Sequence, residues 1–487
     1  MKKLFALLLT LLLILSSLTA CKVSDVGTGT SGDVSDQIGE GDDVNVEGEG
    51  DNAGDNASDG EANNDGGKTE NNDNKDNEGS KDDKDDKDDK TDSSIEELGN
   101  KEYATPKKTS TSGLKFVLNE DKKSYTLVNK GTATATELVI DGYKGLPVTH
   151  IGYAAFENDT AITSVTIGDS VEYIGMYAFS KCSKITSLTM GKGVKNIDDA
   201  AFRYCSSLTT LTVGSSVERI GYQAFYNSAK LNTIKLPSTI RVIERYAFDK
   251  TAYFNNSANW QSNVIYISNC LYRAKSALSG KYTVKDGTVI IADYAFGECA
   301  TFTGIVIPNS VKSIGFQAFF KATKMTSVTI GTGVERIGDQ AFYNSGFYNA
   351  SGNWKNNVLF AGDYLIKAKT TISGAYTVPS GTRAIADLAF GSCDKVTSVN
   401  VTDSVVGIGD YAFNGCASLT SATIGSGVKR IGANAFKGCA ALKSVTFKKT
   451  STWSVDGRKV PTSRLSDKAS AAALLNYECY SEAWKKS

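Results

Sequence analysis

Phenylalanine returns along this chain at a fixed interval. Eight of the ten gaps between eleven such residues are 23 residues long, and the other two are both 48 residues long. The eleven residues are Phe156, Phe179, Phe202, Phe225, Phe248, Phe296, Phe319, Phe342, Phe390, Phe413 and Phe436. A fixed period of this size predicts a solenoid, in which each short unit buries its apolar face only against its neighbours. Stacked units present an extended surface, which favours binding over catalysis.

The residues between two of these phenylalanines alternate as strands do. Apolar and polar side chains alternate over residues 185–190, a glycine turn follows at 191–193, and residues 194–197 form a second extended piece. We therefore predict two short strands in every coil, followed by a tight turn that ends in an Ala-Phe pair. With strands about 4.8 Å apart, eleven coils would stack to roughly 53 Å.

The first 21 residues have the composition of an export signal. Two lysines precede a leucine-rich run, and the segment closes on Leu18-Thr19-Ala20-Cys21. This ending resembles a bacterial lipobox, which implies that cleavage leaves Cys21 as a lipidated N-terminus. Two or more acyl chains are sufficient for stable anchoring in a membrane. The alternative is an ordinary signal peptide with a cysteine after it by chance.

Charge divides the rest of the chain in two. Residues 22–100 carry 26 acidic residues and 7 lysines, a net charge of −19, and have almost no large apolar side chains, so we predict a disordered acidic stalk. Residues 101–487 carry 44 Lys plus Arg and 28 Asp plus Glu, a net charge of +16. A basic exported domain points to anionic partners such as acidic glycans, wall polymers or phospholipid headgroups. Alternatively, the two parts simply neutralise each other. No nucleic-acid-binding module is recognisable.

The repeat itself resembles a known family. From Ile408 to Ile424 the chain reads Ile-Gly-x-x-Ala-Phe-x-x-Cys-x-x-Leu-x-x-Ala-x-Ile, and other coils have Val at the position of Ala422. This pattern is similar to the BspA-like leucine-rich repeat of bacterial surface proteins, over about residues 105–487. The resemblance implies a right-handed leucine-rich solenoid, export to the cell surface and adhesion to host or microbial ligands.

We therefore predict a β-rich solenoid of 23-residue coils between two caps. The solenoid occupies residues 151–447, with an N-terminal β cap at 101–150 and a short helical C-terminal cap at 448–487. Within the C-terminal cap a helix is expected between Ala469 and Trp484. Its Leu474, Leu475 and Tyr477 are expected to face the last coil.

Threonine and serine fill the polar positions of the predicted strands. They could present a ladder of hydroxyls to a glycan or a protein, or simply suit the exposed side of a sheet. The residues are Thr163, Ser164, Thr166, Thr186, Ser187, Thr189, Thr209, Thr210, Thr212, Thr326, Ser327, Thr329, Thr420, Ser421 and Thr423. Lysines recur five residues after the repeated phenylalanine, at Lys184, Lys230, Lys324 and Lys395. They form either a charged rim or a solvated edge.

Six cysteines stand three residues after a repeated phenylalanine. They are Cys182, Cys205, Cys299, Cys393, Cys416 and Cys439, and other coils have Asp, Ser, Thr or Ala there. A position that accepts these residues favours small side chains, so we predict a buried column of mostly free thiols. Optional bridges between Cys182 and Cys205, or between Cys416 and Cys439, are the alternative. No spacing predicts a metal site or a cofactor.

Both 48-residue gaps contain an extra segment, near 251–280 and 345–374, and the two segments match at an offset of 94 residues. Each predicts a hairpin that projects from one edge of the solenoid. Insertions in solenoids often gather on the binding face, and aromatic rings suit sugar rings or protein partners. The candidate ligand-binding residues are Tyr253, Phe254, Trp260, Phe347, Tyr348 and Trp354. Alternatively, Trp260 and Trp354 fill a widened coil and never meet solvent.

The chain offers little for catalysis. Its single histidine, His150, is expected at the surface or at a strand edge, and no multi-histidine metal site can form. Acidic residues at Asp198, Asp293, Asp339, Asp387 and Asp410 fall near one repeat position, as turn preference predicts. We predict a non-enzymatic surface adhesion protein that binds anionic or glycosylated macromolecules, without a cofactor. The alternative is an envelope-remodelling hydrolase or a scaffold for one.

Overall fold

A computed structural model describes residues 98, 100–479 and 481–486. They belong to one unit, Asp88–Ser487. Cys21, the predicted signal segment and the predicted stalk up to residue 97 lie outside the described residues. Among the residues that are described, no helix has the length and apolar character needed to span a bilayer.

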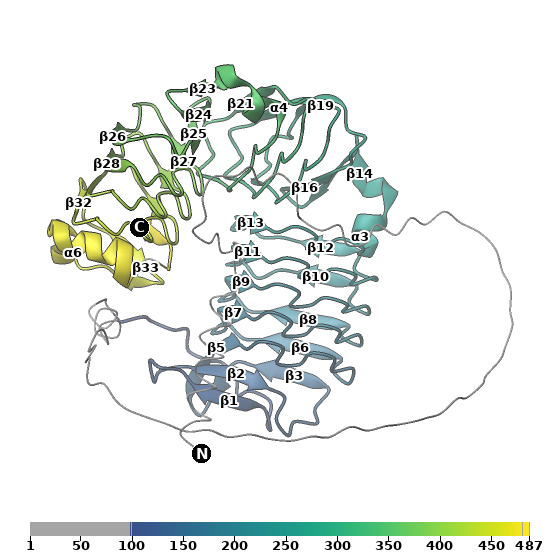
Figure 1. The fold of residues 1–487 in the computed structure, drawn as a ribbon. Coiled ribbons are helices and arrows are strands. Elements are labelled where there is room, and N and C mark those ends of the chain that lie inside the picture. Colours follow the sequence, from purple (N-terminus) through teal and green to yellow (C-terminus); the bar gives the residue numbers. More distant parts are fainter. Residues whose placement is uncertain (1–97, 99, 480, 487) are drawn as a thin grey trace, which may run out of the picture. The chain divides into compact units, whose positions relative to one another are not determined.

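Each coil contributes one longer strand and one two-residue strand, as predicted. In one coil these are β8 (Ser187–Met190) and β9 (Asn196–Ile197), which pair in parallel with the corresponding strands of the adjacent coils. We call the sheets of longer strands the long face and those of two-residue strands the short face. The alternating side chains predicted from the sequence therefore produce a solenoid (Figure 1). Most of its strands bury apolar side chains on the side that faces the core.

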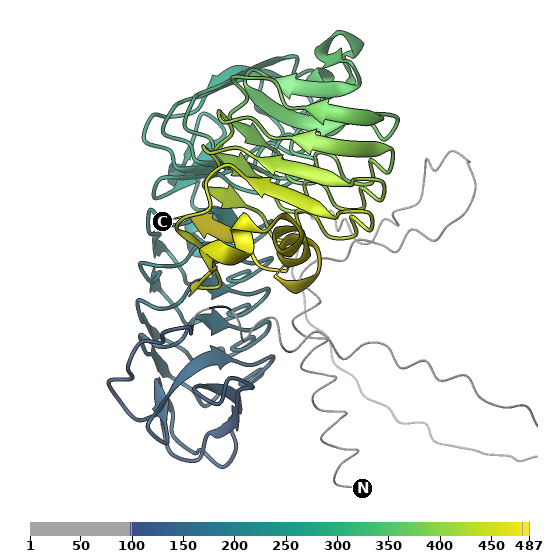
Figure 2. The same ribbon diagram turned by 90° about the vertical axis from the view of Figure 1, so that its left-hand side faces the viewer.

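The long face consists of four parallel sheets. The first contains β3 (Glu137–Ile140), β6 (Ser164–Ile167) and β8, and the second contains β10 (Thr210–Thr212) and β12 (Thr233–Lys235). The third contains β17 (Gly280–Thr283), β19 (Phe302–Ile307) and β21 (Ser327–Ile330). The fourth contains β26 (Gly374–Thr377), β28 (Val396–Asn400), β30 (Ser421–Ile424) and β32 (Ser444–Phe447). Figure 2 shows the strands of this last sheet stacked as parallel green to yellow arrows.

The repeated phenylalanines form the centre of the core. Neighbouring rings stack with centroids 5.1–5.4 Å apart, from Phe156 to Phe248, from Phe296 to Phe342 and from Phe390 to Phe436. All eleven rings are buried. The interval in the sequence thus equals one turn of the solenoid.

The cysteine column is buried and its thiols are free, as predicted. Four of the six thiols point at the carbonyl oxygen of the repeated phenylalanine one coil earlier, as Cys205 Sγ does at 3.3 Å from Phe179 O. The other two, Cys299 and Cys393, follow the insertions and point at the carbonyl oxygens of Lys275 and Lys369 instead. In another coil Ser228 Oγ donates to Phe202 O at 3.0 Å in the same geometry. A small side chain with a donor therefore suits this position, which explains why Cys and Ser alternate there.

The short face is divided into three sheets by the two insertions. The first sheet contains β1 (Lys115–Leu118), β2 (Tyr125–Asn129), β5 (Leu146–Ile151), β7 (Tyr173–Ile174), β9, β11 (Arg219–Ile220) and β13 (Val242–Ile243), with β4 (Gly142–Tyr143) on β5. The second contains β14 (Trp260–Gln261), β15 (Val264–Ile267), β16 (Cys270–Ala274), β18 (Ile290–Ile291), β20 (Ser313–Ile314) and β22 (Arg336–Ile337). The third contains β23 (Trp354–Lys355), β24 (Val358–Ala361), β25 (Tyr364–Ala368), β27 (Ala384–Ile385), β29 (Gly407–Ile408), β31 (Arg430–Ile431), β35 (Trp484–Lys486), β33 (Trp453–Val455) and β34 (Arg458–Lys459).

The insertions contain the predicted hairpins, β15–β16 and β24–β25, but the hairpins do not project freely. Strand β16 pairs in parallel with β18 of the next coil, and β25 pairs with β27. The repeat coils before and after the first insertion still contact each other directly, because Asp293 N–H donates to Ile243 O at 3.0 Å. Extra strands on only one side of that contact spread the coils apart. The stacking direction changes at both insertions, near the labels α3 and β23 in Figure 1.

The C-terminal cap differs from the prediction in two ways. Helix α5 (Thr462–Ser466), helix α6 (Lys468–Ala473) and a π-helical turn (Leu474–Glu478) end before Trp484, which lies in strand β35 instead. Leu474 and Leu475 are buried as expected, whereas Tyr477 is 58% exposed. The π-helical turn shifts the register of the helix, so that Asn476 is turned inward and Tyr477 outward.

Ion pairs join coils that lie far apart in the sequence. Lys485 Nζ lies 2.7 Å from Glu218 Oε1, and Lys101 Nζ lies 2.9 Å from Asp456 Oδ1. Lys485 and Asp456 belong to the C-terminal cap, whereas Glu218 lies in the N-terminal half of the solenoid and Lys101 in the N-terminal cap. The solenoid therefore curves far enough for the short faces of its two halves to approach each other.

Candidate functional site

The two insertions have the same local construction. A hydroxyl at the cysteine-column position begins each one: Thr251 Oγ1 donates to Phe248 O at 2.8 Å and accepts from Phe254 N–H at 3.2 Å. Ser345 does the same toward Phe342 O and Tyr348 N–H, at 2.6 and 3.2 Å. These residues cap the four-residue helices α3 (Ala252–Asn255) and α4 (Gly346–Asn349). Short 3₁₀ turns follow at Ser257–Asn259 and Ser351–Asn353.

Each insertion then places a tryptophan next to a lysine. The indole N–H of Trp260 donates to Phe254 O at 2.8 Å, and Lys275 Nζ lies 4.7 Å from the ring centroid. The indole N–H of Trp354 donates to Tyr348 O at 2.8 Å, with Lys369 Nζ at 5.0 Å. Both tryptophans are half-buried. Each tryptophan therefore fills part of its coil and remains partly exposed to solvent beside an exposed lysine.

The other predicted contact residues lie within the same two insertions. Tyr253 donates its hydroxyl to Tyr266 O at 2.7 Å and is half-buried. Phe254 and Tyr348 are half-buried and contact the tryptophan of their own insertion, edge to face at 5.2 Å in both cases. Phe347 is buried and packs against Phe342, with centroids 5.8 Å apart. Five of the six residues thus reach the surface, and Phe347 packs in the core beneath the second insertion.

The long face carries the predicted ladder of hydroxyls. Thr186 Oγ1 donates to Thr163 O at 3.2 Å, and Thr420 Oγ1 donates to Thr397 O at 2.9 Å. Hydroxyls at these positions hence stabilise the contact between coils. The four lysines predicted as a rim are all exposed.

We did not predict from the sequence that arginines on the short face form ion pairs. Arg219, Arg336 and Arg430 each stand six residues before a repeated phenylalanine. Arg219 pairs with Asp198, Asp199 and Glu244 at 2.6–2.8 Å, Arg336 with Asp387 and Asp410, and Arg430 with Asp410 at 2.6 Å. Three of the five acidic residues that we attributed to turn preference, Asp198, Asp387 and Asp410, therefore pair with arginines. The shared position of the three arginines was the signal that the sequence offered.

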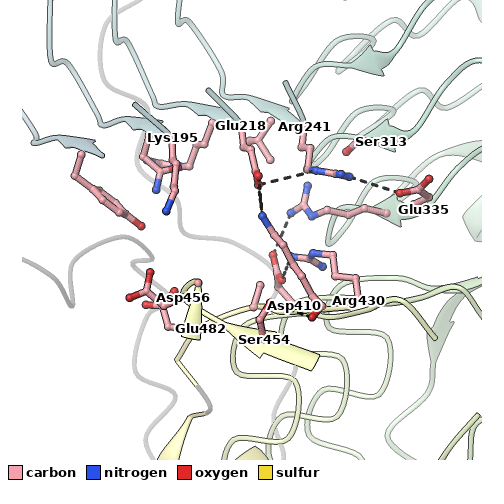
Figure 3. Close-up of a pocket in the computed structure, with 18 residues that line it drawn as sticks. Lys195, Glu218, Arg241, Ser313, Glu335, Asp410, Arg430, Ser454, Asp456 and Glu482 are labelled. Atoms are coloured by element: carbon pink, nitrogen blue, oxygen red, sulfur yellow. Dashed lines mark hydrogen bonds and ion pairs between the residues drawn. The ribbon is translucent and has the colours of Figure 1, made fainter. Parts of the chain in front are cut away.

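One position earlier, charges of opposite sign alternate from coil to coil. Lys195 pairs with Glu172 at 3.1 Å, and Lys312 pairs with Glu335 at 3.6 Å. A cavity of about 250 Å³ lies between this surface and the C-terminal cap. Figure 3 shows carboxylates and cations alternating around it, among them Lys195, Glu218, Arg241, Glu335, Asp410, Arg430 and Asp456. Because these groups largely pair with one another, the walls of the cavity are close to electrically balanced.

Two titratable groups near the short face are affected by burial. Burial, and then the charge of Glu244, raise the pKa of Asp293 above its usual range, and Asp293 accepts from Phe316 N–H at 2.9 Å. Burial lowers the pKa of His150, which stacks on Tyr173 at 5.2 Å. His150 lies in β5 between β2 and β7, so the prediction of a strand-edge position is wrong. Among the described residues no cluster of three metal-ligating side chains occurs.

The repeat can now be compared with known proteins. The family described as the BspA type leucine-rich repeat region matches in six copies, over residues 148–279, 289–373 and 362–456. These matches cover more than half of the chain. The chain belongs to the BspA type leucine-rich repeat family. Leucine-rich solenoids of this type are typically binding scaffolds at the bacterial surface, so the coarse function is protein binding or adhesion.

Solved structures with similar repeats come from several bacteria. A leucine-rich cell surface protein of Faecalibacterium prausnitzii is 21% identical, with 70% of this chain and 94% of that chain covered and a TM-score of 0.26. A leucine-rich repeat protein of Bacteroides ovatus is 21% identical, with 69% and 93% covered and a TM-score of 0.25. One of T. pallidum is 17% identical, with 64% and 91% covered and a TM-score of 0.23. A search of curated proteins gave no match.

Proposed function

We propose that this BspA type protein is a lipid-anchored adhesion protein of the bacterial cell surface. Its solenoid binds anionic or glycosylated macromolecules of a host or of other microbes. The lipobox-like sequence ending in Cys21 supports the anchor, and the net charge of +16 in residues 101–487 supports anionic partners. The acidic segment 22–100 separates the anchor from the solenoid.

The pair of matched insertions is the observation that carries this proposal. A core position would need neither a tryptophan edge at the surface nor a lysine beside it, yet both insertions provide the two together. An aromatic edge with a neighbouring ammonium group suits a ligand that combines an apolar surface with a negative charge. The duplication doubles the site, and two weak contacts on one rigid scaffold strengthen binding to a polymeric ligand.

The test is a binding array of glycans and extracellular proteins, probed with the chain that begins at residue 22 at low and high salt. We expect binding to acidic ligands that weakens as salt screens the charges. Trp260→Ala with Trp354→Ala should lower the affinity for the best ligand at least tenfold, about 1.4 kcal/mol. Unchanged binding together with a lowered melting temperature would show that the tryptophans only fill their coils.

A further inference from the structure

A continuous row of aromatic rings crosses several coils and ends in the second insertion. Each ring is adjacent to the next: Phe320 lies 5.9 Å from Tyr294 and 6.1 Å from Tyr343. Tyr348 lies 5.3 Å from Tyr343 and 5.2 Å from Trp354. On the other side Arg245 joins Tyr294 to Tyr246, and Tyr246 contacts Tyr222 at 5.9 Å. We call this set the aromatic stripe: Tyr222, Arg245, Tyr246, Tyr294, Phe320, Tyr343, Tyr348 and Trp354.

The stripe reaches the surface on both sides of the buried Tyr294, at positions where the repeat does not require aromatic residues. Tyr222 is 41% exposed, Tyr343 is 38% exposed and the adjacent Phe316 is 40% exposed. Tyr246, Phe320, Tyr348 and Trp354 are half-buried. At the position of Tyr343, other coils have Ser180, Gly297, Gly391, Asn414 or Lys437, which shows that a ring is not needed there for packing. Exposed Tyr, Trp and Arg are the residues that most often dominate the energetics of protein interfaces.

A face of several of these rings is already covered by a neighbouring side chain. The guanidinium of Arg245 lies 3.8 Å from the centroid of Tyr294 and 4.5 Å from that of Tyr246. Lys321 lies over Phe320, and Phe320 stacks on Tyr343 with the planes 19° apart. A sugar ring that stacks on an aromatic face would find few faces free. What remains is ring edges, tyrosine hydroxyls and cations, which suit an acceptor-rich polypeptide better than a stacked sugar.

The charge of the stripe is positive and partly uncompensated. Arg245 forms no ion pair with any residue that the structure describes, although most arginines of the short face have carboxylate partners. Lys369 over Trp354 likewise has no carboxylate partner among the described residues. Beside the stripe, Glu298 pairs with Lys321 at 3.8 Å. An acidic partner would provide the missing carboxylates.

We propose that the aromatic stripe docks an extended, acidic segment of a partner protein. This inference rests on the proposed surface-binding function and identifies the partner class and the docking surface. The stripe crosses five coils and one insertion, a length of roughly 25 Å at about 4.8 Å for each step. An extended polypeptide of about eight residues spans that distance at about 3.3 Å for each residue. Its carboxylates contact Arg245 and Lys369, and its apolar side chains contact the ring edges.

The two insertions contribute differently to this surface. Trp354 joins the stripe through Tyr348 and Tyr343, whereas the ring of Trp260 contacts Phe254, which leans on the buried Tyr272. The position that holds Tyr343 in one coil holds the buried Asp249 in the other. Trp260 therefore lies in the proposed binding site but outside the stripe. The two share the same hydrogen bond and the same lysine contact, and they differ in their connection to the stripe.

Intrinsic fluorescence tests the location of the partner. The probe is a synthetic peptide of alternating glutamate and leucine, about ten residues long, added to the chain that begins at residue 22. The measurement is made in the Trp260→Phe background, so that Trp354 is the tryptophan of the two insertions that can report binding. We expect the peptide to change the tryptophan emission of this variant, and we expect the change to disappear when Trp354→Phe is added. Persistence of the change in the double variant would overturn the assignment to the stripe. No binding by the wild-type protein would also overturn the inference, while array hits on glycans would leave the proposed function standing.

Charge reversal tests the role of Arg245. Arg245→Glu should weaken peptide binding at least about tenfold, since it replaces an attraction at the centre of the stripe with a repulsion. Lys395→Glu makes the same change in net charge at an exposed turn and should leave binding within about twofold. Equal losses in both variants would show that net charge alone attracts the peptide. Binding of heparin that depends on Arg245, with no binding of the peptide, would assign the stripe to an acidic glycan and overturn the proposal.

Discussion

At the scale of single residues, a repeated position carries the same physical task in every coil. The stacked phenylalanines exclude water along the whole core, and the position three residues later places a small donor against a carbonyl of the preceding coil. These tasks follow from apolar periodicity, and so the sequence predicts both columns. The charged positions on the short face change from coil to coil, and their pairing is visible only when the coils are stacked.

Truncating one repeated phenylalanine should be costly. Phe202 is fully buried between Phe179 and Phe225, at 5.1 and 5.3 Å. Phe202→Ala removes the ring and leaves a cavity that the coils on either side cannot close, so we expect a loss of about 3–5 kcal/mol in the free energy of unfolding. Chemical denaturation measures it. A loss below about 1 kcal/mol would contradict the account of the core.

The cysteines should be inert in the folded protein. Burial raises the pKa of Cys182 to about 12, and all eight described thiols are buried. We expect iodoacetamide to modify them only after denaturation. Cys205→Ser should keep the stability within about 1 kcal/mol, since Ser228 makes the same hydrogen bond. Rapid labelling of the native protein would contradict a closed column.

Asp293 should make stability depend on pH. Its pKa is raised in the folded state, so the folded protein binds more protons than the unfolded one, and stability falls as pH rises from the unfolded pKa through the folded pKa. Asp293→Asn keeps an oxygen to accept from Phe316 N–H and removes the titration. The stability of the variant minus that of wild type should therefore be larger at pH 9 than at pH 5. Thermal unfolding of the variant and of wild type at pH 5 and pH 9 measures this difference in stability. The same difference at both pH values would contradict the prediction.

At the scale of elements, each insertion begins at a position of the cysteine column whose side chain makes a second hydrogen bond. Ser345 and Ser228 both donate to a phenylalanine carbonyl, but Ser345 also caps helix α4. The sequence predicted the hairpins from strand alternation. It could not predict that they join the short face, because that depends on which edge the adjacent coils leave open. The small helices were missed for a related reason, since four residues are too few to show a helical period.

A pair of serine variants separates the two tasks. Ser345→Ala loses both the donated hydrogen bond and the cap, whereas Ser228→Ala loses only the donated bond. We expect Ser345→Ala to be less stable than Ser228→Ala by about 1 kcal/mol, the usual cost of a helix cap. Urea denaturation of the two variants provides the comparison. Equal losses of stability in the two variants would show that the helix cap does not stabilise the insertion.

At the scale of the whole solenoid, the insertions change the stacking direction of the coils. Ion pairs between distant coils stabilise the resulting curvature. Neither effect is visible in a single 23-residue unit, and the pairing of Lys485 with Glu218 spans 267 residues. The sequence therefore predicts the architecture of each coil and the location of both insertions. The curvature requires the assembled structure, because it arises from strands added on one side of a sheet.

High salt should loosen the contact between the two halves. The bridging pairs include exposed groups, and exposed pairs contribute roughly 0–1 kcal/mol each and are screened by salt. With dyes on Glu120→Cys and Lys468→Cys, energy transfer should fall between about 0.1 and 1 M NaCl. The buried native thiols do not compete for the dyes. Constant transfer would show that packing alone sets the curvature.

We propose that binding resides where the chain departs from its own repeat, at the two insertions. The most direct measurement is the affinity of the chain that begins at residue 22 for its best array ligand, for wild type and for the double variant Trp260→Ala with Trp354→Ala, beside the melting temperature of each. We predict at least a tenfold loss of affinity with the solenoid still folded. Undiminished affinity in the folded double variant would contradict the claim, because binding would then belong to the plain coils.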